Sequence, residues 1–320
     1  MPRAPLVSIA IPTYNSARYL GPTIDSILRQ SMPDLELILF DDGSTDETRS
    51  ISSGYATRDP RVRVACGNHG GISAARNGAI AAMDRRSEFI LLFDHDDVWE
   101  PDALEQLMNA IARAPASVAA HGLARCIDAD GALIPGDDHA ERSRNRFAVV
   151  DGGLVSLPST SPTTFGALLV KNYPTTPGTT LVRRAVFDRI GPFEASTSPC
   201  DDWDMNLRLA RQGDFAFVDS VLLSWRRHGA AASNVSTRWR EAYMNTRRRT
   251  IEDPTNTPSQ REAARHAARI DAQDLRRNAR SAVLRGSFGV AARKVARSLL
   301  LESIGRSTSS AMDPGADSHA

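Results

Sequence analysis

Five consecutive apolar residues followed at once by three carboxylates constrain this chain more than any other feature. Phe89–Phe93 has the length of a strand that is buried on both faces. Asp94, Asp96 and Asp97 follow it directly, so they are expected at the carboxyl end of a central strand, where open α/β sheets bind ligands. Acidic side chains this close repel one another unless a cation lies between them, which favours a divalent-metal site over a solvated acidic turn.

Strand and helix patterns alternate through the first hundred residues. Apolar runs of strand length are Val7–Ile11, Leu35–Phe40, Arg61–Cys66 and Phe89–Phe93. Between the first two, Ala17–Gln30 carries apolar residues at helical spacing. This alternation is typical of crossover units, so we expect an α/β fold with a mostly parallel, twisted sheet flanked by helices.

The loops that follow these strands carry side chains suited to a nucleotide. Tyr14 follows the first expected strand and Asp42 follows the second, while Asp94 and Asp96 follow the fourth. Carboxyl ends of parallel strands share one edge of the sheet, so these residues should meet although they are distant in sequence. An aromatic ring can stack on a base, and a carboxylate can accept from a ring N–H. Taken singly, Tyr14 could equally be a surface tyrosine and Asp42 part of an ordinary turn.

Composition bounds the class of protein. The 320 residues are 41% hydrophobic and 24% charged, which suits one large domain with an appendage, or two domains. The three cysteines form no close pair, so neither a disulfide framework nor a zinc site is indicated. The first residues lead straight into a strand pattern, and no window is apolar enough to span a membrane. A cytoplasmic protein is therefore expected.

Four ordered motifs carry a resemblance. The chain resembles the family 2 glycosyltransferases of the GT-A fold, a Rossmann-like α/β architecture, over roughly residues 5–230. The motifs are Pro12–Asn15, Asp41–Asp46, Asn68–Asn77 and Asp94–Asp97. The resemblance implies transfer of a sugar from a nucleotide-sugar donor with inversion at the anomeric carbon, usually with Mg²⁺ or Mn²⁺. A role in polysaccharide biosynthesis would fit this chemistry.

The resemblance also assigns roles at the donor end of the site. It implies that Pro12, Tyr14 and Asp42 hold the base, which would be uracil in a UDP-linked donor. Arg76 would support the base pocket or the phosphates. Residues implied near the metal are Asp96 as the direct ligand, Asp94 for the ribose or the metal, and Asp97 behind them.

Two later motifs would complete the reaction centre. Asp201 and Asp202 begin a segment with helical spacing, and from the residues alone they are acidic helix caps whose ionised form the helix dipole favours. The resemblance implies instead a Glu-Asp motif, with Asp201 in the glutamate's place and Asp202 as the general base. Similarly, His228 follows two arginines in what could be an exposed basic turn, but the resemblance implies contact with the diphosphate or the metal.

The expected domains are a glycosyltransferase domain over residues 1–235, a helical extension over 236–306 and a disordered tail over 307–320. The first domain divides into a nucleotide-binding half (1–115) and an acceptor half (116–235). Within the acceptor half, Gly136–Arg146 and Leu157–Thr180 are polar and rich in Ser, Thr, Pro and Gly, so they are expected to be long loops.

The extension is basic. It holds sixteen Arg and Lys against seven Asp and Glu, although the whole chain has a net charge of only +1. Ser259 and Glu262 are expected to form a capping box that opens a long helix, and Val290–Ile304 a second amphipathic helix. These helices should pack on the catalytic domain; the alternative is peripheral contact with the inner face of a membrane.

The expected partners are a nucleotide-sugar donor and a saccharide or lipid-linked acceptor, with no nucleic acid. Two alternatives stay open at this point. A sugar-phosphate nucleotidyltransferase shares the sheet type, but it would need a glycine-rich loop where Pro12–Asn15 stands. A non-catalytic scaffold that binds nucleotide-sugars would be supported by loss of Asp202 or of Asp94 and Asp96, and all three are present.

Overall fold

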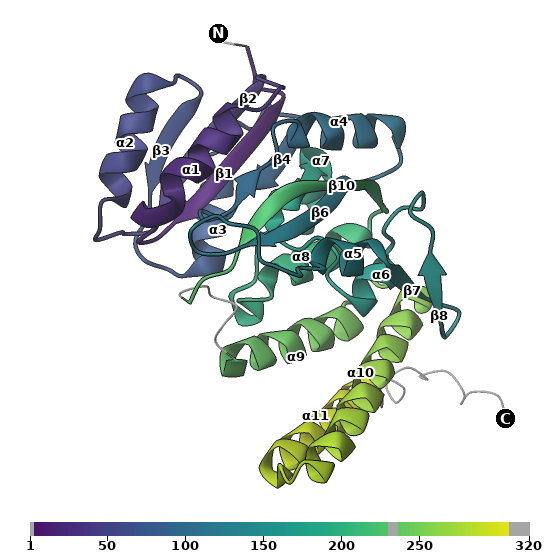
Figure 1. Cartoon of the computed structure of the whole chain (residues 1–320). Helices are drawn as coiled ribbons and strands as arrows, with labels where there is room; N and C mark the ends of the chain where they lie inside the picture. The colour runs from purple at the N-terminus through teal and green to yellow at the C-terminus, as the bar shows by residue number, and fades with distance from the viewer. Residues whose placement is uncertain (1–2, 230–235, 307–320) are drawn as a thin grey trace, which may run out of the picture.

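The structure is a computed structural model that describes residues 3–229 and 236–306. An eight-stranded sheet lies at its centre, in the order β3-β2-β1-β4-β9-β6-β10-β5. Strands β9 and β5 run antiparallel to their neighbours and the other six run parallel to one another. Figure 1 shows helices on both faces of this twisted sheet, so the expected α/β architecture is confirmed.

The nucleotide-binding half forms as the apolar pattern predicts. Its elements are β1 (Val7–Thr13), α1 (Ala17–Leu28), β2 (Leu35–Asp41), α2 (Thr48–Arg58), β3 (Val62–Cys66), α3 (Ile72–Ala81) and β4 (Phe89–Leu92). In the register of the sheet Thr13 lies beside Asp41, and Ala10 lies beside Leu92. The loops after β1, β2 and β4 therefore leave the sheet at one edge.

Alternation along β1 divides the core between the two faces of the sheet. Val7, Ile9 and Ile11 pack with residues of α1 and of α4 (Ala103–Arg113) in one buried cluster. Ala10 points to the other face and packs with a cluster that includes α3 and α8 (Asp201–Ala210). Because both faces are covered, the central strands are mostly apolar, as is typical of parallel sheets.

The second half extends the sheet. β5 (Val98–Trp99), β6 (Ala119–Ile127), β9 (Thr180–Arg183) and β10 (Phe215–Arg226) are its strands, and α7 (Arg184–Ile190) follows β9. β10 extends as far as Arg226 because it pairs with β6 to that point and with β5 at Leu223 and Ser224. This extension carries Trp225 and Arg226 to the same edge of the sheet as the loop after β4.

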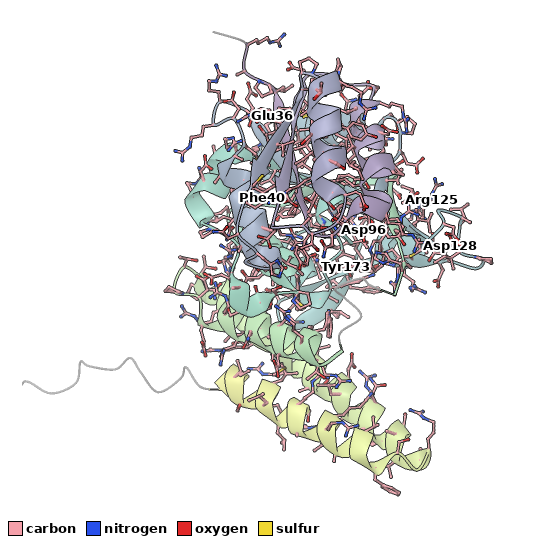
Figure 2. All side chains as sticks on the ribbon, turned by 90° about the vertical axis from the view of Figure 1, so that its left-hand side faces the viewer. Glu36, Phe40, Asp96, Arg125, Asp128 and Tyr173 are labelled. Carbon is pink, nitrogen blue, oxygen red and sulfur yellow. The ribbon has the colours of Figure 1, made fainter. Side chains whose placement is uncertain are left out.

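The prediction of long loops in the acceptor half is wrong. The segments contain α5 (His139–Arg144), α6 (Phe165–Val170) and a 3-10 turn (Pro177–Thr179), and between them lies the hairpin β7 (Arg146–Val150) and β8 (Gly153–Leu157). Tertiary contacts order them: Tyr173, labelled in Figure 2, accepts a hydrogen bond from the Phe147 N–H at 2.7 Å. Arg146 is fully buried, and its guanidinium donates to Thr163 and to three loop carbonyls.

The C-terminal extension is helical, as expected. It comprises α9 (Ser236–Glu252), α10 (Pro258–Leu284) and α11 (Phe288–Arg306). α9 packs on α8 through a stack of Trp203 and Tyr243, and α10 packs on α6 and α11. The capping box that opens α10 is formed by Thr257 and Gln260 and not by Ser259 and Glu262, because Pro258 takes the first helical position.

The helices α9 and α10 share a buried core with the rest of the chain. Ala264, Ala267, Ala268 and Ala272 of α10 are buried in the same cluster as α8. The predicted tail over 307–320 lies outside the described residues, and the division into domains stays a prediction. None of the helices among the described residues is long and apolar enough to cross a bilayer.

Candidate active site

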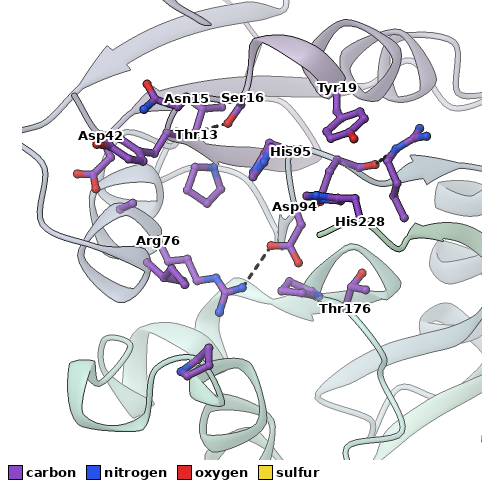
Figure 3. Close-up of a pocket in the computed structure, with 18 of the residues that line it drawn as sticks. Thr13, Asn15, Ser16, Tyr19, Asp42, Arg76, Asp94, His95, Thr176 and His228 are labelled. Carbon is purple, nitrogen blue, oxygen red and sulfur yellow. Dashed lines mark hydrogen bonds and ion pairs between the residues drawn. The ribbon is translucent and has the colours of Figure 1, made fainter. Parts of the chain in front are cut away.

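A cavity of about 750 Å³ opens at the carboxyl edge of the sheet. Figure 3 shows it among residues that follow β1, β2 and β4, with Thr176 and His228 opposite, and Pro199 before α8 also lines it. All eight residues predicted for the site line this one cavity: Pro12, Tyr14, Asp42, Arg76, Asp94, Asp96, Asp202 and His228. The aspartates after β4 and the aspartate in the first turn of α8 therefore share a cleft.

The base end of the cavity is formed by the loops after β1 and β2. Asp42 is buried, and its carboxylate accepts hydrogen bonds from the backbone N–H groups of Gly70 and Gly71 at 3.1 Å. Gly71 has φ +84°, a left-handed conformation that favours glycine and aims its N–H at the carboxylate. Beside it the rings of Tyr14 and His69 stack, with centroids 4.0 Å apart. An aromatic surface thus adjoins a carboxylate held in a fixed position. These are the two features that recognition of a nucleotide base needs.

The loop after β4 gathers negative charge. Asp96 lies 2.7 Å from Nε2 of His228, and its neighbour Asp97 accepts from the Arg226 N–H at 3.0 Å. Burial raises the pKa of Asp94 above its ordinary value, and the charge of Asp96 adds to that increase. Burial and the charges of Asp96 and Asp94 raise the pKa of Asp97 as well. The Arg76 charge opposes the increase in the pKa of Asp94 but does not cancel it.

This donor set suits a hard divalent cation. Carboxylate oxygens are the ligands that Mg²⁺ and Mn²⁺ prefer, and a cation would relieve the repulsion among the acids. Within residues 3–229 and 236–306, no three His, Cys, Asp or Glu side chains are already arranged around one metal position. Asp96 and His228, which lie 2.7 Å apart, could therefore supply two ligands to a cation whose remaining ligands come from elsewhere, such as a diphosphate.

Arg76 connects the loop after β4 to α8. Its guanidinium donates to Asp94 at 3.2 Å and to Asp201 at 2.7 Å, and the first of these contacts is drawn in Figure 3. Burial disfavours its charge, but Asp201, Asp94 and Asp202 together hold the pKa of Arg76 above its usual value. The guanidinium thus lies between the two acidic groups and lines the cavity.

Asp201 and Asp202, the first two residues of α8, have different environments. Both line the cavity, but Asp201 is fully buried and accepts from both Arg76 and Ser73, whereas Asp202 is only half-buried. Burial raises the pKa of Asp202 to about 7; the Arg76 charge opposes this increase, and Asp201 and Asp94 reinforce it. Burial and the neighbouring acids thus act against the ionised form of Asp202, which a position at a helix start favours.

Sequence reasoning missed the group that orients Asp202. Asn172 donates from Nδ2 to Oδ2 of Asp202 at 2.9 Å, and Asn206 of α8 donates to Oδ1 of Asn172 at 2.9 Å. The second bond fixes which end of the Asn172 amide faces the carboxylate. Asn172 is a single amide in a segment expected to be a loop, so no local pattern signals its role.

Fold and site together define a class. A mostly parallel sheet with a nucleotide-type cleft at its carboxyl edge, paired acids after a central strand and a further acid at a helix start are the features of GT-A glycosyltransferases. Residues 8–191 match the sequence profile of Glycosyl transferase family 2. The chain belongs to this family, which confirms the resemblance and sets aside the nucleotidyltransferase alternative.

Relatives agree with this assignment. The chain is 36% identical to a hyaluronan synthase of Pasteurella multocida over 146 residues, which is 45% of this chain and 15% of that protein. It is 29% identical to a chondroitin synthase of Escherichia coli over 232 residues, which is 72% of this chain and 30% of that protein. The chain thus spans less than a third of the length of these relatives.

Solved structures share the fold. A structure of S. aureus TarS residues 1–349 in complex with UDP-GlcNAc superposes with a TM-score of 0.61 at 16% identity, covering 92% of this chain and 90% of that one. The mannosyltransferase PcManGT from Pyrobaculum calidifontis, in complex with GDP-Man and Mn²⁺, gives a TM-score of 0.59 at 17% identity, with 94% and 87% covered.

Proposed function

We propose that this glycosyltransferase moves a sugar from a nucleoside-diphosphate donor to an acceptor hydroxyl in one inverting, divalent-metal-dependent displacement, with Asp202 as the general base. The observation that carries the proposal is the convergence of acids from β4 and α8 on one cavity that also holds Tyr14 and Asp42. A UDP-linked donor is the one we expect. UDP and UDP-GlcNAc bind the related TarS fold, and GDP-Man binds PcManGT.

Asp202 suits the role of base because of its position and its pKa. An acceptor hydroxyl becomes a good nucleophile only when its proton is removed during attack on the anomeric carbon. The acceptor oxygen forms the new bond to that carbon, the bond to the diphosphate oxygen breaks, and the proton passes to the Asp202 carboxylate. A pKa of about 7 places this carboxyl where a general base works best near neutral pH.

The diphosphate would lie between Arg76 and the loop after β4. A bound divalent cation would neutralise the charge that develops on the leaving diphosphate. Asp96 and His228 would hold the cation, with Asp94 beside them. The guanidinium of Arg76 would face the phosphates from the other side, because Asp94 and Asp201 already fix its position.

The arrangement favours a single displacement over retention by double displacement. Retention would need a free carboxylate on the opposite face of the sugar ring. Asp201 cannot serve, since it is fully buried and engaged by Arg76 and Ser73. The product would therefore carry the inverted anomeric configuration.

We expect a saccharide or a lipid-linked saccharide as the acceptor. Two of the relatives named above are polysaccharide synthases, and this supports an acceptor that is itself a sugar chain. Such an acceptor offers the hydroxyl that Asp202 would deprotonate.

The test is incubation of the protein with a panel of nucleotide-sugars and Mn²⁺. Slow release of the nucleoside diphosphate and free sugar would support a transferase, with the rate lost on addition of a chelator. Proton NMR of a product formed with an added acceptor would report the anomeric configuration. Binding of a nucleotide-sugar without any turnover would instead support a scaffold and refute the proposal.

A further inference from the structure

The hairpin of α10 and α11 carries an unpartnered apolar row. Phe288, Ala292, Val295 and Leu299 recur at intervals of four, three and four residues along α11, so they share one face of the helix. Phe288 is 69% exposed, Val295 42% and Leu299 56%. The residues that α11 packs inward are different ones, among them Leu301 and Ile304. The apolar row thus faces solvent on a helix whose other side is already packed.

A row of two arginines and a leucine on α10 lies on the same side of the hairpin. Arg276 pairs with Glu302 of α11 at 2.6 Å, which marks one flank of the helix–helix contact. Arg280 and Leu284 follow Arg276 at four-residue intervals, and Glu302 lies one turn beyond Leu299. The two rows therefore form one surface, which we call the hairpin face: Arg280, Leu284, Phe288, Ala292, Val295 and Leu299. Leu284, at 88% exposed, is its most prominent apolar side chain.

The charge around this face has a single sign. Residues 275–301 contain seven Arg and Lys and no Asp or Glu. Arg277, Arg280, Arg285 and Arg293 are exposed, and of these only Arg277 has a carboxylate partner among the contacts of the described residues. In a symmetric pair of chains the arginines of one hairpin would approach those of the other, and the adjacent acid Glu302 already pairs with Arg276, which disfavours a second copy as the occupant.

The hairpin also has the right placement to meet a large partner. In Figure 1 the turn between α10 and α11 lies at the lower end of the molecule, away from the sheet, and Figure 2 shows the same projection from the side. The cavity lies at the carboxyl edge of the sheet and is lined by none of the residues of the hairpin.

We propose that the hairpin face binds the surface of an anionic lipid bilayer. Helices that lie in a membrane interface typically combine exposed leucine and phenylalanine with flanking arginines. Their apolar side chains enter the boundary of the acyl chains, and their cations contact the lipid phosphates. The helices lie along the membrane, since neither is apolar enough to cross it. This inference goes beyond the donor chemistry and does not depend on it.

Vesicle flotation of the full chain tests the proposal. Vesicles of phosphatidylcholine mixed with phosphatidylglycerol are compared with vesicles of phosphatidylcholine alone, at low and high salt. The wild type should float with the anionic vesicles and stay behind with the neutral ones, and high salt should weaken its binding.

Two double variants separate the electrostatic contribution to vesicle binding from the apolar one. Arg280→Glu/Arg285→Glu and Leu284→Ser/Phe288→Ser should each lower partitioning into anionic vesicles at least about tenfold. The matched control for charge is Arg85→Glu/Arg113→Glu, at exposed arginines outside the hairpin, and the control for apolar exposure is Leu154→Ser in the β7–β8 hairpin. Both controls should bind like the wild type. Circular dichroism of each variant checks that the helices remain folded.

Three results would overturn the proposal. Equal binding to neutral and anionic vesicles would remove the electrostatic part of the argument. Loss of binding on charge reversal alone, with the serine variant unaffected, would indicate a soluble polyanion in place of a bilayer. A dimer mass in light scattering without vesicles, reduced to a monomer by Leu284→Ser/Phe288→Ser, would assign the hairpin face to a second copy.

Discussion

Replacing Asp202 by asparagine should abolish turnover and at the same time stabilise the fold. The substitution keeps the shape of the side chain and an oxygen that can accept from Asn172, but removes the carboxylate that would take the acceptor proton. Loss of a general base lowers kcat by about 10²–10⁴-fold. Donor affinity should stay within about twofold, because Asp202 would act on the acceptor and not on the nucleotide.

The gain in stability follows from the pKa of Asp202. Its pKa is about 7 in the folded chain against 3.8 for the ordinary carboxyl, so the folded state binds more protons than the unfolded state between these two values. Stability therefore falls as pH rises from 4 to 7, and the full cost of ionising Asp202 is present above pH 7. A neutral asparagine avoids that cost.

The size of the gain can be bounded. A difference of about three pKa units corresponds to about 4 kcal/mol, and partial exposure of Asp202 to solvent reduces this to about 1–2 kcal/mol. For a chain of 320 residues the melting temperature should then rise by about 1.5–3 °C at pH 8. At pH 5 the gain should be less than half as large, because the wild-type carboxyl is then mostly protonated when folded.

The assay combines differential scanning fluorimetry across pH with single-turnover kinetics and donor titration. Asp102→Asn is the matched control, because Asp102 is also an acid at a helix start but is exposed and makes no capping hydrogen bond. This control should change neither kcat nor the melting temperature. Wild-type kcat should rise with pH to a plateau above about 7. Full activity of Asp202→Asn, or a lower melting temperature than wild type at pH 8, would refute the assignment.

Three further predictions concern the rest of the site. Asp96→Ala should remove the part of donor affinity that depends on Mn²⁺ in calorimetric titrations, and unchanged affinity with Mn²⁺ would contradict a metal role. Asn172→Ala should lower kcat without changing the donor KM and should move the acidic limb of the kcat–pH profile upward, since the ionised form of Asp202 loses a hydrogen bond. An acidic limb that stays at the wild-type pH would indicate that Asn172 has only a structural role. Tyr14→Ala should raise the donor KM about tenfold through lost base stacking, and Tyr14→Phe should restore it; a donor KM that Tyr14→Ala leaves unchanged would contradict stacking.

The strands of the nucleotide-binding half could be predicted from sequence because their signal is local. A run such as Phe89–Phe93 is apolar on both faces, and its neighbours in the sheet have the same pattern. The order of strand and helix then fixes which loops share an edge. That is why Tyr14, Asp42 and Asp94 could be placed together before any contact was known.

The acceptor half could not be predicted in the same way. Arg146 is a charged residue in a polar stretch, and only its burial against Phe217 and the carbonyls of a neighbouring loop shows that it orders the hairpin. The helix α6 is short, and its apolar residues are interpretable only once α8 and α10 cover them.

By itself the sequence determined the sheet, the edge at which its loops gather and the acids available there, because strand patterns and short motifs are local properties of the chain. The tertiary structure alone decided what those acids can do. Asp201 and Asp202 are adjacent in sequence, yet one is locked by Arg76, 125 residues away, and the other faces the cavity with a raised pKa. Protonation and orientation depend on burial and on neighbours that only folding supplies.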